Sequence, residues 1–312
     1  MSLVSIVLPI FNAERYLKSA MSSLLSQTFR DVEVIAVDDG STDRSSAILA
    51  EFRKADSRVH AIARPNTGIV GALNDGISVA RGDFVARMDA DDICLPRRIE
   101  KQVGFLMQNP KCLAVGSDVL YTDPEGDPLM RHYPAQDHET IVSNLLNGDG
   151  GAIVHPSVMF RKEGLIATGG YRARYEWIED LDLFLRLSDA GRLANLPDVH
   201  LHYRQHLQSV NHLRRDRIAM RMELVNCRRL VLGLPPLKCE RPESYDYCEA
   251  DFRRHWAYDA AKGGNWTTAR KNALNAMRRN PCARANWRCL RYVITSSLNR
   301  KARYRQNAEL EL

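Results

Sequence analysis

The stretch Ala86-Arg-Met-Asp-Ala-Asp-Asp-Ile-Cys-Leu-Pro96 decides the fold prediction, because three carboxylates directly follow an apolar run. Residues 84–86 have the aromatic and aliphatic character of a buried strand, and Asp89, Asp91 and Asp92 fall where that strand ends. In open α/β sheets, ligands bind in the crevice outside the carboxyl ends of the strands. The position of this acidic turn therefore predicts a ligand site at the edge of a sheet.

Asp89 and Asp91 place two hard oxygen ligands on one side of a turn. Mg²⁺ and Mn²⁺ prefer such ligands, and one or two carboxylates commonly hold them together with substrate phosphates. The pair therefore favours a divalent cation at a nucleotide-diphosphate site. An Asp-x-Asp pair alone is more often a solvated acidic turn, so this interpretation depends on neighbouring motifs. Asp92 suits a helix-capping role better.

The chain before this turn alternates between strand and helix patterns. A Val- and Ile-rich run over residues 3–10 predicts a strand buried on both faces. Asn12 is a favourable N-cap for an amphipathic helix over residues 13–25. Further strands are predicted at residues 32–37, 59–63 and 83–88, with a helix after each of the first two. This β-α repetition indicates an α/β fold with a mostly parallel sheet flanked by helices.

Parallel strands bring residues far apart in the sequence to one edge of the sheet. The predicted strand ends carry Pro9 and Phe11, then Asp39, then Asp89 and Asp91. We therefore expect these residues to line one crevice. The chain contains neither a Gly-x-Gly-x-x-Gly turn after the first strand nor a Gly-x-x-x-x-Gly-Lys-Ser/Thr loop, which excludes both of these phosphate-binding motifs.

Several motifs in this half resemble those of the family 2 glycosyltransferases of the GT-A fold, in the same order and spacing. They are Val4-Ser-Ile-Val-Leu-Pro-Ile-Phe-Asn12, Val37-Asp-Asp-Gly-Ser-Thr-Asp43, Asn66-x-Gly68 with Ala72 and Asn74, and Met88-Asp-Ala-Asp-Asp92. The resemblance covers roughly residues 4–211. It implies a nucleotide-sugar-dependent, inverting transferase assisted by Mn²⁺ or Mg²⁺.

The resemblance also implies roles for single residues on the nucleotide side. Asp39 would accept a hydrogen bond from the N3–H of uracil or thymine, while Pro9 and Phe11 supply a backbone contact and an apolar wall. Weaker candidates for the same pocket are Arg64, Asn66 and Asn74. The alternative for Asp39 is an Asp-Asp-Gly turn before a capped helix.

The metal and the reaction involve a second set of residues. Asp91 would ligate the metal, and Asp89 would reach the ribose, or the ion through water. Asp180 matches the catalytic base of the family, with Glu179 and Asp182 as competitors and a helix N-terminal anion as the alternative role. A family histidine near the metal and diphosphate matches His206, for which a surface histidine is the competing interpretation. His155 is a less favoured candidate for the acceptor cleft.

Domain boundaries follow from pattern and charge. We expect a GT-A domain over residues 1–213, with a nucleotide-binding half at 1–96 and an acceptor half at 97–213. Residues 214–312 form a predicted basic helical extension, with 22 Lys and Arg against 10 Asp and Glu. It contains one helical hairpin of tetratricopeptide type around the Gly-Gly-Asn turn at residues 263–265.

The end of this extension carries an apolar stripe beside arginines, formed by Trp287, Leu290, Ile294 and Leu298. The stripe is compatible with a helix packed on the protein or with a helix lying on an anionic membrane. No apolar run reaches about 18 residues, so no membrane span is predicted. The seven cysteines form no Cys-x-x-Cys pair, which favours a reducing compartment. We therefore expect a cytoplasmic protein, with the C-terminal helices as a candidate peripheral contact on the inner face of the membrane.

The predicted function is transfer of a hexosyl or N-acetylhexosaminyl group from a nucleotide sugar, a UDP-sugar in preference, to a glycan or lipid-linked acceptor in surface polysaccharide synthesis. A dTDP-sugar donor would make the same contact with Asp39, because thymine also carries an N3–H donor. Outside the basic extension the chain is mildly acidic, which argues against a nucleic-acid partner. One alternative is a sugar nucleotidyltransferase, which predicts an early Gly-rich phosphate loop that is absent here. The other is a catalytically weak scaffold, which predicts nucleotide binding without turnover.

Overall fold

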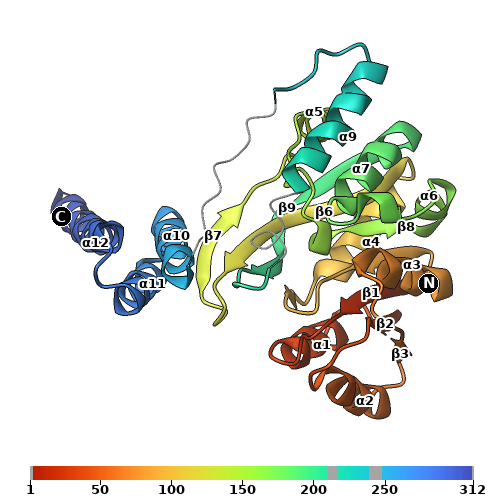
Figure 1. Cartoon of the computed structure of the whole chain (residues 1–312), viewed down its shortest axis with the longest axis horizontal. Helices are drawn as coiled ribbons and strands as arrows, with labels where there is room; N and C mark the ends of the chain where they lie inside the picture. The colour runs from red at the N-terminus through yellow and green to blue at the C-terminus, as the bar shows by residue number, and fades with distance from the viewer. Residues whose placement is uncertain (1–2, 210–216, 239–247, 311–312) are drawn as a thin grey trace. The chain divides into compact units, whose positions relative to one another are not determined.

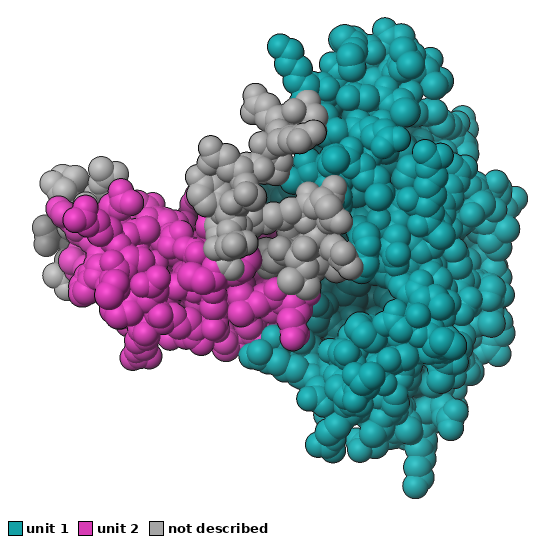
Figure 2. All heavy atoms as spheres, viewed as in Figure 1, with its two compact units in different colours: residues 1–119, 132–203, 214–241 teal, residues 120–131, 204–213, 242–312 magenta. Residues whose placement is uncertain are grey.

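The computed structural model describes residues 3–209, 217–238 and 248–310, with side chains up to residue 298. The chain forms two compact units (Figure 2). Unit 1 comprises residues 1–119, 132–203 and 214–241, and unit 2 comprises residues 120–131, 204–213 and 242–312. Part of the predicted extension, residues 214–241, thus groups with unit 1. The domain boundary at residue 213 stays a prediction.

The first half of unit 1 is built on parallel strands. β1 (Val4–Ile10) lies between β2 (Val32–Asp38) and β4 (Phe84–Arg87), and β3 (Val59–Ala63) pairs with β2, all in parallel. Every residue of β2 and β4 is buried, which explains their unbroken apolar runs. The predicted strands of this half are therefore confirmed.

Three helices connect these strands (Figure 1). They are α1 (Leu17–Leu25), α2 (Ser45–Ala55) and α3 (Ile69–Val79). α3 packs closely on β1, since a Cβ added at Gly76 would lie 2.5 Å from Cγ1 of Val7. The predicted cap at Asn12 is wrong. Asn12 has a φ of 50°, its side chain accepts a hydrogen bond from the backbone N–H of Thr42 at 2.8 Å, and α1 begins only at Leu17.

The second half of the sheet is antiparallel. Its strands are β5 (Ile93–Cys94), β6 (Cys112–Thr122), β7 (Pro128–His132), β8 (Met159–Arg161) and β9 (Arg192–Arg204). β8 pairs antiparallel with β4 and with β6, and β5 pairs antiparallel with β9. Within the described residues the sheet has nine strands in the order β3-β2-β1-β4-β8-β6-β9-β5, with β7 paired to β6. The predicted α/β class holds, with the parallel strands confined to one side.

Residues Arg192–Arg204 form one continuous strand, β9. Pro197 lies inside it and lacks a backbone N–H, but Pro197 and Asp198 are exposed and leave the extended chain uninterrupted. The remaining helices of unit 1 are α4 (Arg98–Gln108), α5 (His138–Leu146), α6 (Lys162–Ala167), α7 (Glu179–Ala190) and α9 (Arg217–Val231). Single 3₁₀ turns occur at His155–Ser157 and Ala173–Tyr175.

In its described residues, unit 2 combines the end of the β6–β7 hairpin with three helices. They are α10 (Glu249–Lys262), α11 (Trp266–Arg279) and α12 (Arg284–Leu310), so the predicted helical hairpin around residues 263–265 is confirmed. Trp256 and several alanines form its core with Leu129 of β7 and with Cys289 and Val293 of α12. In the described part of the chain, no helix is both long enough and apolar enough to span a bilayer.

Candidate active site

The parallel strands of unit 1 bring the predicted nucleotide residues to one edge of the sheet (Figure 1). Asp39 follows the last residue of β2, Asp89 follows β4 by two residues, and β1 lies between these strands. Pro9 lies in β1 and is partly buried, while Phe11 follows β1 with 52% of its surface exposed. An exposed aromatic ring at a strand end is available to contact a flat ligand.

The two carboxylates of the Asp-Asp-Gly motif have different surroundings. Asp38 is buried and turned back into its own loop, where it accepts hydrogen bonds from Ser41 N at 3.0 Å and from Ser46 Oγ. Asp39, also buried, reaches across to the loop before α3, where Thr67 N and Gly68 N donate to it at 3.1 and 2.9 Å. Asp38 therefore organises the turn, and Asp39 joins two loops at the edge.

Asp39 retains limited capacity for a ligand. Arg64 Nε lies 3.3 Å from Asp39 Oδ1, so together with Thr67 and Gly68 three groups approach this carboxylate. An ionised carboxylate offers roughly four acceptor directions. One direction is left for an outside donor such as a base N–H. Arg64 itself also lies 3.3 Å from Asp75 of α3, which fixes it against that helix.

Asn66 and Asn74 occupy different positions. Asn66 is exposed and close to the Asp-Asp-Gly turn, since a Cβ added at Gly40 would lie 2.8 Å from Asn66 N. The amide of Asn74 donates to Tyr171 O at 2.8 Å and accepts from Tyr171 N at 3.1 Å. This reciprocal pair holds the segment before α7. A nucleotide contact by either asparagine stays a prediction.

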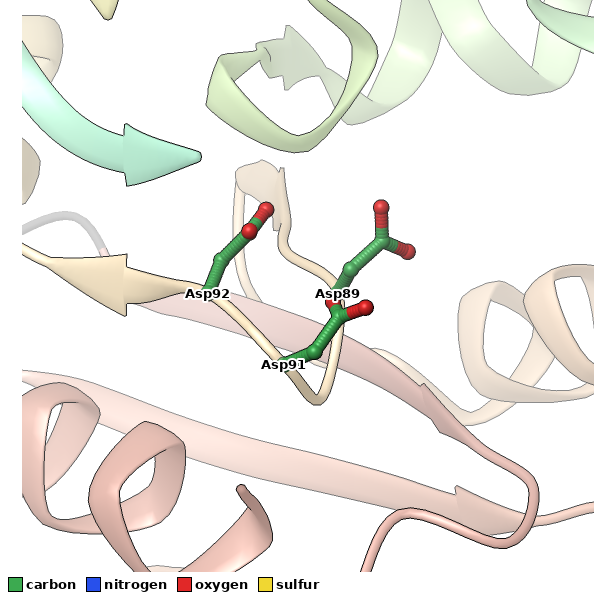
Figure 3. A group of neighbouring side chains, drawn as sticks. All are labelled: Asp89, Asp91 and Asp92. Atoms are coloured by element: carbon green, nitrogen blue, oxygen red, sulfur yellow. The ribbon is translucent and has the colours of Figure 1, made fainter. Parts of the chain in front are cut away.

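The acidic turn between β4 and β5 holds a compact set of carboxylates (Figure 3). Asp89, Asp91 and Asp92 each offer an oxygen atom, and these atoms lie within 4.8 Å of one another. Such a donor set of hard oxygens fits Mg²⁺ or Mn²⁺. Asp92 is fully buried and does not cap α4, whose N-cap is Arg97 without a side-chain hydrogen bond.

The sequence interpretation missed Arg87, the buried last residue of β4. Its guanidinium holds Asp89 with two contacts, Nη1 to Oδ2 at 2.8 Å and Nη2 to Oδ1 at 2.7 Å. The available signal was an arginine inside the apolar run Phe-Val-Ala-Arg-Met. Arg87 thus contacts both oxygens of Asp89 and fixes the orientation of this carboxylate at the acidic turn.

Asp180 lies in the first turn of α7, half-buried, and accepts a hydrogen bond from Leu181 N at 2.8 Å. Burial raises its pKa, whereas Arg221, Arg87 and Arg217 oppose the rise. Burial also raises the pKa of Asp89, and the charges of Asp91 and Asp180 add to that rise. The structure therefore brings Asp180 into the electrostatic range of the acidic turn.

Glu179, next to Asp180, is buried. Burial, followed by the charge of Asp180, raises the pKa of Glu179 to about 8, so this group is largely protonated at neutral pH. His155 Nδ1 lies 3.8 Å from its Oε1, and His155 Nε2 is 2.6 Å from the hydroxyl of Tyr171. Burial lowers the pKa of His155 well below 6.5, which keeps the imidazole neutral.

The other competitor for the base role, Asp182, has its carboxylate engaged. Arg186 donates to Asp182 Oδ2 at 2.6 and 3.0 Å, and the same guanidinium donates to Thr168 O and Gly170 O. Asp182 therefore ties α7 to the preceding loop.

That loop contains Trp177 at a φ of 76°, a left-handed conformation that is unusual for a bulky residue and tends to occur at functional sites.

His206 belongs to unit 2, where its backbone N–H donates to Ser209 Oγ at 3.1 Å. Its role as a metal ligand stays a prediction. Asp39, Asp89, Asp91 and Asp180 all belong to unit 1. The described geometry of unit 1 thus provides a buried carboxylate at the end of β2, a turn with three clustered carboxylates after β4, and a further carboxylate in the first turn of α7.

A family model described as Glycosyl transferase family 2 matches residues 5–168, more than half of the chain. The chain belongs to glycosyl transferase family 2. The amylovoran biosynthesis glycosyltransferase AmsE of Erwinia amylovora is 31% identical over 215 residues, which cover 66% of this chain and 78% of AmsE. Across three curated relatives that it matches, the chain spans 66% to 78% of their lengths.

Solved structures agree with the GT-A fold expected for this family. S. aureus TarS 1–349 in complex with UDP-GlcNAc superposes with a TM-score of 0.59 at 17% identity, covering 98% of this chain and 92% of TarS. The mannosyltransferase PcManGT from Pyrobaculum calidifontis, in complex with GDP-Man and Mn²⁺, gives 0.57 at 15% identity, with coverages of 95% and 81%. The predicted family, the GT-A fold and the glycosyltransferase class are therefore confirmed.

Proposed function

We propose that this chain transfers a hexosyl or N-acetylhexosaminyl group from a UDP-sugar to a glycan or lipid-linked acceptor, with inversion at the anomeric carbon, in polysaccharide synthesis. Membership of family 2 supports the transferase class, and the name of AmsE supports a role in polysaccharide biosynthesis. The preference for UDP rests on Asp39, whose remaining acceptor direction suits the N3–H of uracil, a donor that cytosine lacks. TarS, which has the same fold, is described with UDP-GlcNAc.

The observation that carries this proposal is that unit 1 contains both the clustered carboxylates of Asp89 and Asp91 and, in the first turn of α7, Asp180. The charge of Asp180 contributes to the raised pKa of Asp89, which supports their proximity. A direct displacement then requires a base on the face opposite the nucleotide. Asp180 is the carboxylate near the acidic turn that combines partial exposure with no salt bridge in the described set.

Asp91 would hold Mn²⁺ or Mg²⁺ most directly, with Asp89 second because Arg87 engages both of its oxygens. When bound, the cation supplies Lewis-acid neutralisation of the charge on the departing diphosphate. Asp39 and Phe11 would orient the uracil ring of the donor. The ion pair between Arg87 and Asp89 would keep Asp89 in one rotamer. His206 stays a proposed additional ligand.

In the proposed reaction, Asp180 takes the proton of the acceptor hydroxyl while the hydroxyl oxygen forms a bond to the anomeric carbon. The bond from that carbon to the diphosphate oxygen breaks, and the nucleoside diphosphate leaves with the electron pair. Glu179 is kept protonated by burial, and Asp182 is held by Arg186, so Asp180 is the acidic residue in the first turn of α7 that we assign as the base.

The proposal is tested by incubating the full chain and Mn²⁺ with UDP-glucose, UDP-galactose, UDP-GlcNAc, dTDP-glucose and GDP-mannose and measuring nucleotide release. We expect one UDP-sugar to be consumed fastest. Preference for GDP-mannose would contradict the proposed UDP donor. Binding of UDP without consumption of any donor would favour the scaffold alternative. With an acceptor in hand, the anomeric configuration of the product by NMR tests inversion.

We also propose a peripheral membrane contact through α12, which suits a lipid-linked acceptor and a cytoplasmic location. Cys289 and Val293 are buried in unit 2, while Trp287, Ile294 and Leu298 are 57%, 43% and 57% exposed. Three exposed arginines flank them, namely Arg284, Arg288 and Arg291. Apolar side chains beside cations complement an anionic bilayer surface.

Co-sedimentation with vesicles containing phosphatidylglycerol tests this contact. We expect the Trp287→Ser/Ile294→Ser variant to lose most of its binding, whereas Leu274→Ser, a comparably exposed position on α11, keeps it. Equal binding of both variants, or no binding by the wild type, would remove the membrane contact and leave the transferase proposal intact.

A further inference from the structure

α9 brings two arginines to the catalytic end of α7 in unit 1. Arg217, Arg221 and Val225 follow one another at intervals of four residues, so they share one face of α9. Val225 is fully buried in the same hydrophobic cluster as Leu181 of α7 and Leu145 of α5. Because Val225 packs into this cluster, the face of α9 that carries Arg217 and Arg221 is turned toward the core of unit 1.

Both arginines act on Asp180. Arg221 is the largest of the cationic influences that hold down the pKa of Asp180, and Arg217 contributes in the same direction. The two guanidiniums also repel each other, because burial and then the charge of Arg221 lower the pKa of Arg217. Two cationic side chains of α9 therefore act on the carboxylate in the first turn of α7.

Arg221 is only partly satisfied by the described protein. Its Nη1 lies 3.5 Å from Gly148 O, at the limit of a hydrogen bond, and its buried Nε has no hydrogen-bond partner. Glycines provide its space, since a Cβ added at Gly150 would lie 3.2 Å from Nη2. A guanidinium carries five N–H donors in a planar fork that matches phosphate and carboxylate groups. An unsatisfied, half-buried arginine of this kind is suited to an anion.

We propose that Arg217 and Arg221 bind an anionic group, a phosphate or a carboxylate, of the acceptor beside the hydroxyl that Asp180 deprotonates. This inference rests on the proposed function and narrows its acceptor to an acidic one. Arg217 and Arg221 act on Asp180, the proposed catalytic base, whereas the donor diphosphate is assigned to the turn at Asp89 and Asp91. A sugar phosphate and a uronic acid would supply the same chemistry.

The test is calorimetric titration of the full chain, saturated with UDP and Mg²⁺, with glucose 1-phosphate, glucuronate and glucose. We expect at least one anionic sugar to bind more tightly than glucose, and the tighter of the two identifies phosphate or carboxylate as the recognised group. Arg217→Gln and Arg221→Gln should each weaken that binding about tenfold or more, as expected for a lost charge-assisted hydrogen bond. Their affinity for UDP should change less than about twofold, which also shows that the variants fold.

Arg228→Gln is the matched control, because Arg228 lies on the same helix and pairs with Asp189 instead of Asp180. It should bind the anionic sugar as the wild type does. The inference is overturned if both anionic sugars bind no better than glucose, or if the Arg217 and Arg221 variants lose UDP affinity, which would assign the pair to the donor. If the wild type does not bind UDP, the proposed function fails. The same titrations without UDP then still decide the role of the arginines.

Discussion

At the scale of single residues, neighbouring carboxylates at the start of α7 have opposite surroundings. Asp180 is half-exposed and faces three arginines, while Glu179 is 6% exposed and lies beside the neutral imidazole of His155. Adjacent positions on a helix point in directions about 100° apart, which lets one side chain enter the core while the next faces the site. The division of roles between the two therefore follows from helix geometry.

Asp180→Asn tests the base. We expect transfer to fall about 10²- to 10⁴-fold, the usual contribution of a positioned general base. Affinity for UDP with Mn²⁺ should stay near that of the wild type, because Asp180 does not contact the nucleotide in this account. Asp189→Asn, at the other end of α7, is the control and should retain activity. Near-normal transfer by Asp180→Asn would show that another group is the catalytic base.

Glu179→Gln tests the buried neutral carboxyl through stability. The pKa of Glu179 is about 8 when folded against 4.5 ordinarily, so between these pH values the unfolded chain releases a proton that the folded chain retains. The contribution of Glu179 to stability therefore decreases as the pH rises from about 4.5 to about 8, by about 1 kcal/mol per pH unit. The free energy of unfolding of the Glu179→Gln variant should lack this decrease with pH. Urea denaturation at pH 5, 6, 7 and 8 should show its advantage over the wild type growing with pH, and a constant difference would refute the assignment.

At the scale of elements, the β6–β7 hairpin end and α11 of unit 2 are joined by a charged network. Asp123 is fully buried, and it receives Lys271 and the amide of Asn272, the latter at 2.9 Å. Arg253 of α10 pairs with Glu125 at 2.9 Å. A buried carboxylate deprived of its cation is costly, so these pairs fix the hairpin against the helices.

Lys271→Met should lower the free energy of unfolding of unit 2 by about 1–3 kcal/mol, because Asp123 keeps its amide partner but loses its cation. Lys262→Met removes an exposed pair with Asp259 at 3.7 Å and should change stability by less than about 1 kcal/mol. Urea denaturation followed by tryptophan fluorescence compares the two. Equal effects would show that the network does not stabilise unit 2.

Elements with strong periodicity were predictable from the sequence, and their connections were not. The four parallel strands and the α10–α11 hairpin lie within a few residues of their predicted bounds, because unbroken apolar runs and a Gly-Gly turn specify them locally. Asn12 was misread, since its partner Thr42 is 30 residues away. Arg221 was missed for the same reason, because Gly148 lies 73 residues before it in the sequence. Arg87 was missed although its partner Asp89 is only two residues away, because an arginine inside an apolar run does not reveal which carboxylate it pairs with.

At the scale of the whole molecule, one property of unit 1 is decisive: its parallel strands bring Asp39, Asp89 and Asp91 to one edge of the sheet, where we propose that a cation and a nucleoside diphosphate bind. The placement of Asp39 at the same sheet edge as Asp89 and Asp91 was predictable once strand direction was known, because parallel strand ends share one edge. Asp180 lies in the first turn of α7, and its expected role came from the family resemblance. Specificity for the sugar and the acceptor was not predictable from the sequence, because it depends on side chains whose positions are set by loop packing.

Calorimetric titration of the full chain with UDP, with and without Mn²⁺, tests this property most directly when the wild type is compared with Asp91→Asn. We predict that Mn²⁺ strengthens UDP binding to the wild type at least about tenfold, in line with the contribution of outer-shell and ligand groups to metal sites, and that Asp91→Asn loses this gain. Failure of UDP to bind with Mn²⁺ present, or an unchanged gain in Asp91→Asn, would contradict the assignment of the acidic turn.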